Sequence, residues 1–476
     1  MARKFEMTIN GQPVAAAEYV EIKNPADGSV VGLSPLGTRA HLDSAVAAAK
    51  RAFASWRETS DEQRADACRA IAKVLADNAA ELSQLLTREQ GKPLKGLGSE
   101  FELGGCAGWS GYVASQSLPV KILEDSPKNR IEQHRVPIGV VGSITPWNWP
   151  LLIAIWHIVP AVRTGNTVVI KPSPFTPLST LRMIELLNSV LPPGVINVVS
   201  GEDRLGADMS AHPDISKVVF TGSIATGKKV MASAAGTLKA LTLELGGNDA
   251  GIVLPDADVE KLAEGLFWGA FINSGQTCGA LKRLYVHDSV FERTCQALTK
   301  LAQTIPMGDG SAEGSLLGPL QNERQYQRVI ELVEDAKAHG AKVLTGGAPT
   351  QGPGYFYPIT LVTGIEDGVR LVDEEQFGPV LPIVRYTDVD DAIRRANGTD
   401  FGLDASVWGS DPELLRKVAQ RLEAGTVLIN KHAEIAPHVP FGGIKSSGLG
   451  VEFGQEGLEA YTTIKIINSP ASGSTA

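Results

Sequence analysis

The chain has 476 residues, of which 43% are hydrophobic and 20% are charged, and its formal net charge at pH 7 is −9. This length predicts roughly two or three domains with sizeable cores, and an acidic balance without a long basic run argues against a nucleic-acid partner. We expect a cytoplasmic protein without a membrane partner, because no segment reaches the roughly 18 apolar residues of a membrane span and the first residues lack the apolar stretch of a signal peptide.

The N-terminal part of the chain predicts turns followed by helices. Residues 1–35 carry turn residues between short strand-like segments. Apolar residues then recur at helical spacing from Leu42 to Trp56, and further helices are expected over 61–89 and 98–117.

Two alternating segments, 119–123 and 129–136, predict a β-hairpin around a polar turn. A hairpin of this kind leaves a strand edge that needs a cover. The chain ends with another strand-like segment, 461–467, which is a candidate partner for that edge within one subunit or between subunits.

From residue 137 onward, short apolar strands alternate with helices. Strands are expected at 138–144, 167–170, 195–199, 217–220 and 238–243, with helices over 150–162, near Pro177 and from Ser223. Fully apolar short strands separated by helices indicate a parallel sheet covered on both faces, whose ligands bind beyond the carboxyl ends of the strands. The second half repeats an αβ rhythm, with helices expected at 258–272, 289–303, 319–339, 388–396 and 411–421 and strands at 283–287, 379–385, 403–408 and 425–429.

Polar residues follow the strands of the first sheet where ligands are expected. Asn148, Lys171 and Glu244 each come soon after a predicted strand. Ser223 follows another and opens a helix, so backbone amides and the helix dipole there could hold a phosphate.

The four cysteines are Cys68, Cys106, Cys278 and Cys295, without a CxxC pair or a group with histidine at zinc spacing, which predicts reduced thiols and no metal site. Most lone cysteines are small core residues, but Cys278 lies between Gly275 and Gly279, which allow a ligand to approach closely.

A cysteine nucleophile needs donors for an oxyanion and a base. Asn148 and the Cys278 amide could supply the donors, and Glu244 could activate a water. A turn asparagine and an exposed strand-end glutamate are the simpler interpretations of each motif alone. No GxGxxG follows a strand, so the residues alone leave a dehydrogenase and a cysteine hydrolase open.

Several motifs together resemble those of the aldehyde dehydrogenase family, in that family's order and over nearly the whole chain. They are Pro146-Trp147-Asn148-Trp149-Pro150, Phe220-Thr221-Gly222-Ser223, Glu244-Leu245-Gly246-Gly247-Asn248, Gly275-Gln276-Thr277-Cys278, Glu375-Gln376-Phe377-Gly378-Pro379 and Pro440-Phe441-Gly442-Gly443-Ile444-Lys445. The family binds its dinucleotide without the GxGxxG fingerprint, which agrees with its absence here.

The resemblance implies an α/β fold made of a modified Rossmann cofactor domain (1–117 and 138–246), a second α/β catalytic domain (247–446) and a small β oligomerisation element (118–137 and 458–470) of a homodimer or homotetramer. It implies that Cys278 attacks an aldehyde, that Asn148 and the Cys278 amide hold the oxyanion, and that Glu244 activates the water that hydrolyses a thioester to the acid. A CoA-acylating variant, a cofactor-free cysteine esterase or acyltransferase, and a binding protein on an inactive scaffold are the alternatives.

The implied cofactor is NAD. The resemblance places around it Ile144, Trp147, Lys171, Ser173, Gly201, Gly222, Ser223, Gly246, Glu375 and Phe377. Many NAD-preferring members carry a glutamate three residues after the lysine, where this chain has Pro174, so NADP could be tolerated. Asp203 could restore some negative charge nearby.

The position of the motifs implies a substrate tunnel lined by Trp149, Trp156, Phe267 and Thr277. These apolar and aromatic groups favour a medium aliphatic or aromatic aldehyde over a charged semialdehyde, and His432 and His438 precede the glycine-rich loop where substrate contacts are expected. Some members relay protons through a lysine and a C-terminal glutamate, at positions that correspond here to His157 and Gln455. Gln455 cannot accept a proton, which counts against that relay.

Overall fold

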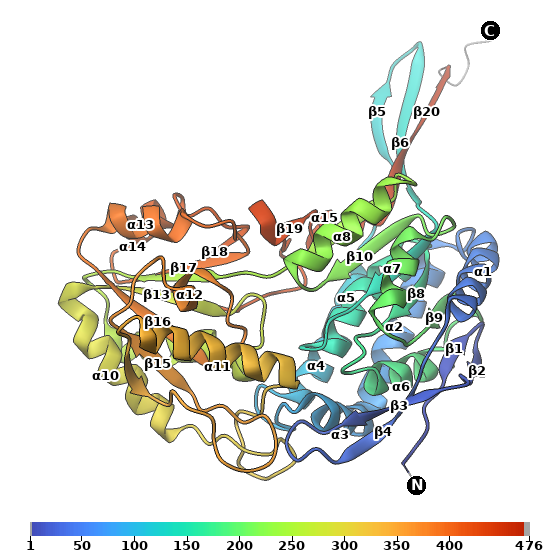
Figure 1. Cartoon of the computed structure of the whole chain (residues 1–476). Helices are drawn as coiled ribbons and strands as arrows, with labels where there is room; N and C mark the ends of the chain where they lie inside the picture. The colour runs from blue at the N-terminus through green and yellow to red at the C-terminus, as the bar shows by residue number, and fades with distance from the viewer. Residues whose placement is uncertain (1, 471–476) are drawn as a thin grey trace.

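Two large sheets and one small sheet organise the chain, and a computed structural model describes them over residues 2–470 (Figure 1). The first large sheet has eight strands in the order β19-β11-β10-β7-β8-β9-β1-β2. The second has seven strands in the order β14-β15-β16-β13-β12-β17-β18. The cleft between these two halves of the molecule contains the candidate site described below.

The N-terminal segment supplies edge strands and a layer of helices. Its strands are β1 (Met7–Ile9), β2 (Gln12–Val14), β3 (Tyr19–Lys23) and β4 (Val30–Pro35), and its helices are α1 (Arg39–Trp56), α2 (Asp61–Asp77), α3 (Ala79–Gln90) and α4 (Ser99–Ser115). The single helix expected over 61–89 is therefore wrong. The chain breaks at Asn78, whose side-chain amide donates to the Val74 carbonyl oxygen at 2.8 Å and so competes with the helical backbone bonds.

The centre of the first sheet confirms the predicted doubly wound arrangement. Its parallel strands are β7 (Val140–Ile144), β8 (Thr167–Lys171), β9 (Ile196–Val198), β10 (Lys217–Thr221) and β11 (Ala240–Glu244), and its helices are α5 (Pro150–Arg163), α6 (Leu178–Leu187), α7 (Asp203–Ala211) and α8 (Ile224–Ala235). Ile144 pairs with Lys171, and Thr221 pairs with Glu244. This register brings the carboxyl ends of the strands to one edge of the sheet.

The second sheet is built from β12 (Asp249–Val253), β13 (Leu281–His287), β14 (Lys342–Thr345), β15 (Thr360–Thr363), β16 (Val380–Tyr386), β17 (Asp404–Trp408) and β18 (Thr426–Ile429). Its helices are α9 (Val259–Phe271), α10 (Asp288–Thr304), α11 (Glu323–Ala338), α12 (Arg370–Asp373), α13 (Val389–Asn397) and α14 (Pro412–Ala419). Strands β12, β14 and β15 were not expected from the sequence. Strand β12 pairs in parallel with both β13 and β17, so it lies near the centre of this sheet.

The small sheet projects away from the two large ones (Figure 1). It contains the expected hairpin, β5 (Lys121–Asp125) and β6 (Asn129–Pro137), and the terminal strand β20 (Thr462–Pro470). Strand β20 pairs with β6 along its whole length, so the terminal strand finds its partner within the same chain. The domain ranges given above stay a prediction.

The glycine-rich segment that precedes β20 returns to the first sheet. It contains η2 (Lys445–Ser447), β19 (Gly448–Leu449) and α15 (Gly454–Glu459). Strand β19 pairs with the end of β11, where Gly448 lies opposite Glu244.

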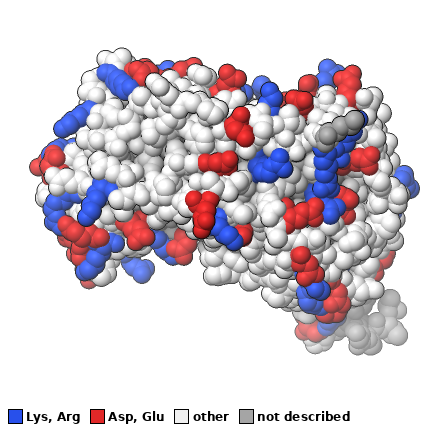
Figure 2. All heavy atoms as spheres, turned by 90° about the horizontal axis from the view of Figure 1, so that it is seen from below, with Lys and Arg blue, Asp and Glu red and all other residues white. Residues whose placement is uncertain are grey.

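Acidic and basic side chains are mixed over the face seen from below, without an extended field of one sign on that face (Figure 2). None of the helices within residues 2–470 combines the length and the apolar character that crossing a membrane requires.

Candidate active site

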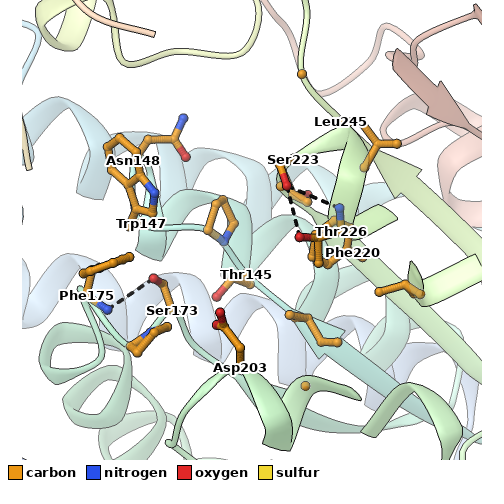
Figure 3. Close-up of a pocket in the computed structure, with 18 of the residues that line it drawn as sticks. Thr145, Trp147, Asn148, Ser173, Phe175, Asp203, Phe220, Ser223, Thr226 and Leu245 are labelled. Atoms are coloured by element: carbon orange, nitrogen blue, oxygen red, sulfur yellow. Dashed lines mark hydrogen bonds between the residues drawn. The ribbon is translucent and has the colours of Figure 1, made fainter. Parts of the chain in front are cut away.

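A cleft of about 960 Å³ lies at the carboxyl edge of the first sheet. One wall comes from the strand ends and the helices that follow them, and the other carries Cys278, Glu375 and Phe377 from the second half of the chain. Figure 3 shows Ser173 and Asp203 on one side of this cavity and Ser223, Thr226 and Leu245 across from them, with Trp147 and Asn148 at its upper end.

The loop before Cys278 has an unusual backbone. Asn273, Ser274 and Gly275 have φ values of 52°, 56° and 73°, so consecutive residues adopt the left-handed region. A Cβ on Gly275 would lie 2.1 Å from the carbonyl oxygen of Gly378, so only glycine fits against that segment. Strained backbone of this kind is common at functional sites, where the surrounding contacts hold it in place.

Side-chain bonds hold the same loop. Gln276 accepts a hydrogen bond from the Gln321 backbone N–H at 2.9 Å, and Ser274 donates to the Gly318 carbonyl oxygen at 2.8 Å. Burial raises the pKa of the Cys278 thiol to about 12. The positive charge of the nearby Lys282 ammonium acts against burial and lowers this pKa. Cys278 is only partly buried and lines the cleft, unlike the three buried cysteines Cys68, Cys106 and Cys295.

Asn148 is held rigidly at the start of α5. Its carbonyl oxygen accepts from Lys92 Nζ at 2.8 Å and from Asn273 Nδ2 at 3.0 Å. Its own Nδ2 donates to the Gln276 carbonyl oxygen at 3.0 Å. A side-chain amide carries two hydrogens, so the second one is free for a ligand in the cleft.

Glu244 ends β11 behind the cleft. It is buried, so the simpler interpretation as an exposed strand-end glutamate is wrong. Its side chain is 4% exposed, and both of its carboxylate oxygens lack a hydrogen-bond partner. Burial raises the pKa of its carboxyl well above the usual value, and the charges of Glu452 and Asp404 raise it further. A buried carboxyl without partners is typical of a functional group and unusual for a structural one.

The residues expected to hold a dinucleotide line the cleft, with one exception. Ile144, Trp147, Lys171, Ser173, Gly222, Ser223, Gly246, Glu375 and Phe377 all contribute to its walls. Gly201 does not line it; this glycine packs against Gly37 and Leu205 instead, which corrects its assignment as a cofactor contact.

The lining groups fit the parts of a dinucleotide. Ser223 caps the N-terminus of α8 and accepts from the Thr226 N–H at 3.3 Å, and a helix N-terminus suits a phosphate. A Cβ on Gly246 would lie 2.3 Å from Glu375 Oε2, so glycine allows that carboxylate to lie over the cleft. Burial lowers the pKa of Lys171 to about 8, and Asp203, which also lines the cleft, opposes this shift.

An aromatic cluster lies beside Cys278. Phe441, Phe453 and Leu403 pack together, and Trp109, Trp156, Ile435 and Cys278 pack against them. The Trp156 and Phe453 ring centroids are 4.7 Å apart, and those of Trp109 and Phe453 are 5.6 Å apart. Trp109, Phe441 and Phe453 were missed because they come from segments far from Cys278 in the sequence.

The predicted tunnel residues separate into two groups. Trp149 donates from Nε1 to Thr277 Oγ1 at 3.0 Å, so both lie beside Cys278, and Trp156 belongs to the aromatic cluster. Phe267 is 0% exposed and packs against Phe271 and Trp268 in the core beneath the second sheet. Its place in the tunnel is therefore corrected: on α9 it faces the core and not the cleft.

The buried neighbour of His157 is Glu452 and not Gln455. His157 Nε2 lies 3.1 Å from Glu452 Oε1, and His157 Nδ1 lies 2.8 Å from Ser143 Oγ. Both side chains are almost fully buried, whereas Gln455 is exposed and donates to the Ser117 carbonyl oxygen at 3.2 Å. The carboxylate beside His157 is therefore that of Glu452, and Gln455 lies elsewhere.

The two histidines before the glycine-rich loop lie apart. His432 is buried, and its Nδ1 lies 2.8 Å from Ser406 Oγ, while the His438 ring lies 6.4 Å from that of Tyr112. Within residues 2–470 we find no group of three or more His, Cys, Asp or Glu side chains arranged to hold a metal ion.

A doubly wound sheet with a dinucleotide-sized cleft at its carboxyl edge, lined by Cys278 and Asn148, is typical of α/β enzymes that bind a nucleotide. The model of the aldehyde dehydrogenase family matches residues 13–467. The chain belongs to this family and is an oxidoreductase that acts on aldehydes.

Individual relatives agree over nearly the whole length. The chain is 39% identical over 468 residues to the chloroplastic betaine aldehyde dehydrogenase of Beta vulgaris, covering 95% of this chain and 93% of the relative. It is 37% identical over 477 residues to the peroxisomal aminoaldehyde dehydrogenase 2 of Pisum sativum, covering 97% of this chain and 94% of the relative. The NAD+ complex of the Bacillus cereus aldehyde dehydrogenase superposes with a TM-score of 0.96 at 36% identity, covering 99% of this chain and 97% of that structure.

Proposed function

We propose that the protein oxidises an aldehyde to the carboxylic acid with NAD as the hydride acceptor, through a thioester on Cys278. The observation that carries this proposal is one cleft that brings Cys278 and Asn148 together with the nucleotide-lining residues, while the unpaired carboxyl of Glu244 lies buried behind it. A solved relative is an NAD+ complex, which supports the choice of cofactor.

In this proposal the Cys278 thiol releases its proton to water in the cleft, and the sulfur bonds to the aldehyde carbon, which gives the alkoxide form of a thiohemiacetal. The free N–H of Asn148 and the Cys278 amide stabilise the negative charge on the oxygen. NAD, when bound, supplies the acceptor for the hydride that leaves the same carbon. Trp147 and Phe377, whose ring centroids are 5.3 Å apart, would orient it within the cleft.

Hydrolysis of the thioester needs a base. Glu244, in its carboxylate form, takes a proton from a water that attacks the acyl carbon, and the Cys278 sulfur leaves as the acid forms. Glu452 lies close enough for its charge to raise the pKa of Glu244, and its Oε1 lies 3.1 Å from His157 Nε2, so this pair is our candidate for carrying the proton away. The water-activating carboxyl also favours hydrolysis over transfer of the acyl group to CoA.

The aromatic cluster supports a medium aliphatic or aromatic aldehyde as the substrate. Its walls are the rings of Trp109, Trp156, Phe441 and Phe453, with Leu403 and Ile435. A second candidate is an aldehyde with a quaternary ammonium group, because cations bind aromatic faces and one relative is named a betaine aldehyde dehydrogenase.

The test is a panel of aliphatic, aromatic, semialdehyde and betaine aldehyde substrates with NAD and NADP, followed by reduced cofactor and compared as kcat/KM. We expect the highest values for apolar aldehydes. A preference for betaine aldehyde would select the second candidate. Ester cleavage without any reduced cofactor would instead establish a cofactor-free cysteine hydrolase.

Cofactor choice depends on the adenosine end of the cleft. Pro174 lines it where many NAD-preferring members have a carboxylate, so a 2′-phosphate meets no repulsion from that position. We expect Pro174→Glu to lower kcat/KM for NADP about tenfold relative to NAD, because the new carboxylate repels the 2′-phosphate. Pro174→Gln is the control of equal size, and an equal loss in both variants would show that charge is not the cause.

We also propose that the small sheet joins subunits into a homodimer or homotetramer. Ile464 and Ile466 on β20 are 52% and 50% exposed, and Leu123 on β5 is 55% exposed. Exposed apolar side chains on open strand edges are typical of an interface.

Replacing both Ile464 and Ile466 with lysine should reduce the mass measured by light scattering to that of one 50.4 kDa chain. The reason is that two ammonium groups would have to lose water in the interface. Val190→Lys, at a 38% exposed apolar position elsewhere, is the control and should leave the oligomer intact. An unchanged mass in the double variant would place the interface on another surface.

A further inference from the structure

Lys282 lies buried behind the proposed nucleophile, four residues after it in the chain. It is 2% exposed and occupies the second position of β13. Its Nζ donates to the carbonyl oxygen of Cys278 itself. An ammonium is among the most costly groups to bury, and a chain that buries one needs compensating partners.

The second partner of Lys282 belongs to the cofactor side of the cleft. Its Nζ lies 3.0 Å from Glu375 Oε1 and 5.6 Å from the centroid of the Phe377 ring. Glu375 and Phe377 line the cleft where a nicotinamide ribose is expected. The backbones of the same two segments meet where Gly275 approaches the Gly378 carbonyl. One side chain therefore links the loop of the nucleophile to the loop of the ribose-binding carboxylate.

The charges around Lys282 keep it protonated. Glu375, Asp249 and the thiol of Cys278 raise its pKa above the usual value despite burial. Asp404 and Asp249 are buried acids whose own pKa values are raised by burial, and Glu244 adds a further buried carboxyl. Burial lowers the pKa of His432 to about 3, so this neighbour is neutral.

The adjacent cation does not share this role. Arg283 Nε donates to the Asn248 carbonyl oxygen at 2.7 Å, and its Nη2 donates to the Ala396 carbonyl oxygen at 3.0 Å. Both contacts lie on the other face of β13, because successive residues of a strand point to opposite sides. The charge that opposes the acids around Cys278 is therefore that of Lys282.

We propose that Lys282 is a positioning residue for Cys278. The ammonium of Lys282 stabilises the Cys278 thiolate and couples that thiolate to the carboxylate of Glu375. This inference rests on the proposed role of Cys278 as nucleophile. The Lys282 ammonium favours the charged form of the Cys278 thiol, and the negative charge of Glu375 offsets part of that effect. A change at Glu375 should therefore reach the sulfur through Lys282.

The test is the rate at which iodoacetamide labels Cys278, followed by peptide mass spectrometry from about pH 6 to about pH 10, where the rate follows the thiolate fraction. The assay needs neither aldehyde nor cofactor, so its outcome is separate from that of the dehydrogenase assay. Lys282→Gln keeps an N–H donor for the Cys278 carbonyl but removes the charge, and Lys282→Arg keeps the charge.

We expect Lys282→Gln to label about tenfold more slowly at each pH and Lys282→Arg to stay within about threefold of the parent rate. Glu375→Gln should label faster, because Lys282 then loses its competing partner, and this variant keeps the proposal testable if Lys282→Gln does not fold. A folded Lys282→Gln protein with the parent labelling profile would overturn the proposal, as would a Glu375→Gln protein that labels no faster than the parent.

Discussion

Replacing Cys278 with alanine is expected to lower aldehyde-dependent reduction of the dinucleotide by about 10⁴-fold or more, because the side chain that forms the covalent bond is gone. Dinucleotide binding should persist, since the other lining groups of the cleft stay in place. Quenching of tryptophan fluorescence on titration with NAD measures binding separately from turnover, with Trp147 as the reporter inside the cleft.

Cys295→Ala is the matched control for that experiment. Cys295 is 5% exposed and packs in the core of the second half of the chain, away from the cleft. Its replacement should leave kcat within about twofold of the parent value, since small changes at sites without catalytic contacts affect stability more than chemistry. Turnover retained in Cys278→Ala would remove Cys278 as the nucleophile.

Replacing Glu244 with glutamine should separate the two halves of the reaction. The first turnover should still give reduced cofactor as a burst, whereas steady-state turnover should fall by about 10²-fold to 10⁴-fold, because no base activates the hydrolytic water. Stopped-flow absorbance of the reduced cofactor distinguishes the two phases. Glu456→Gln, an exposed position on α15, is the control and should behave like the parent.

The pH dependence of the parent follows from the same group. The pKa of Glu244 is raised by burial and by the charges of Glu452 and Asp404, so its carboxyl is protonated and inactive as a base at the lower end of the pH range. Hydrolysis should accelerate as pH rises through that raised pKa. The Glu244→Gln variant should lose this rise, and a variant that kept it would assign the titration to another group.

Much of the site could be predicted because its residues are fixed by strand ends. The strands β7, β8, β10 and β11 pair in parallel with one another, and their register brings Ile144, Lys171, Thr221 and Glu244 to one edge of the sheet. Short apolar strands separated by helices in the sequence predict that pairing. The order of the motifs then indicated which groups serve Cys278. The doubly wound fold and the family were predicted correctly for the same reasons.

The errors have local physical causes. The helix break at Asn78 depends on one side-chain bond to the backbone, which helical periodicity does not reveal. Strand β12 was missed because it begins with a polar residue, Asp249, and follows another, Asn248, and both are buried near the cleft. Phe267 is on helix α9, which ends just before the Cys278 loop, but its side chain packs in the core.

Contacts between distant segments were beyond reach of the sequence alone. The sequence suggested Gln455 and not Glu452 as the residue opposite His157. Both residues lie in a segment of glycines and short elements, where no helical or strand periodicity shows which side chains point toward the core. The partnership of Lys282 with Glu375 joins residues far apart in the chain, so only the folded arrangement reveals it. The aromatic cluster beside Cys278 is hidden for the same reason.

Mass spectrometry of the Glu244→Gln protein tests most directly whether Cys278 carries the acyl group. The variant is mixed with an apolar aldehyde and NAD, quenched in acid and digested. We expect the peptide containing Cys278 to gain the mass of one acyl group, in step with the reduced cofactor formed. Reduced cofactor formed in that burst without an acyl group on Cys278 would contradict this role of the cysteine.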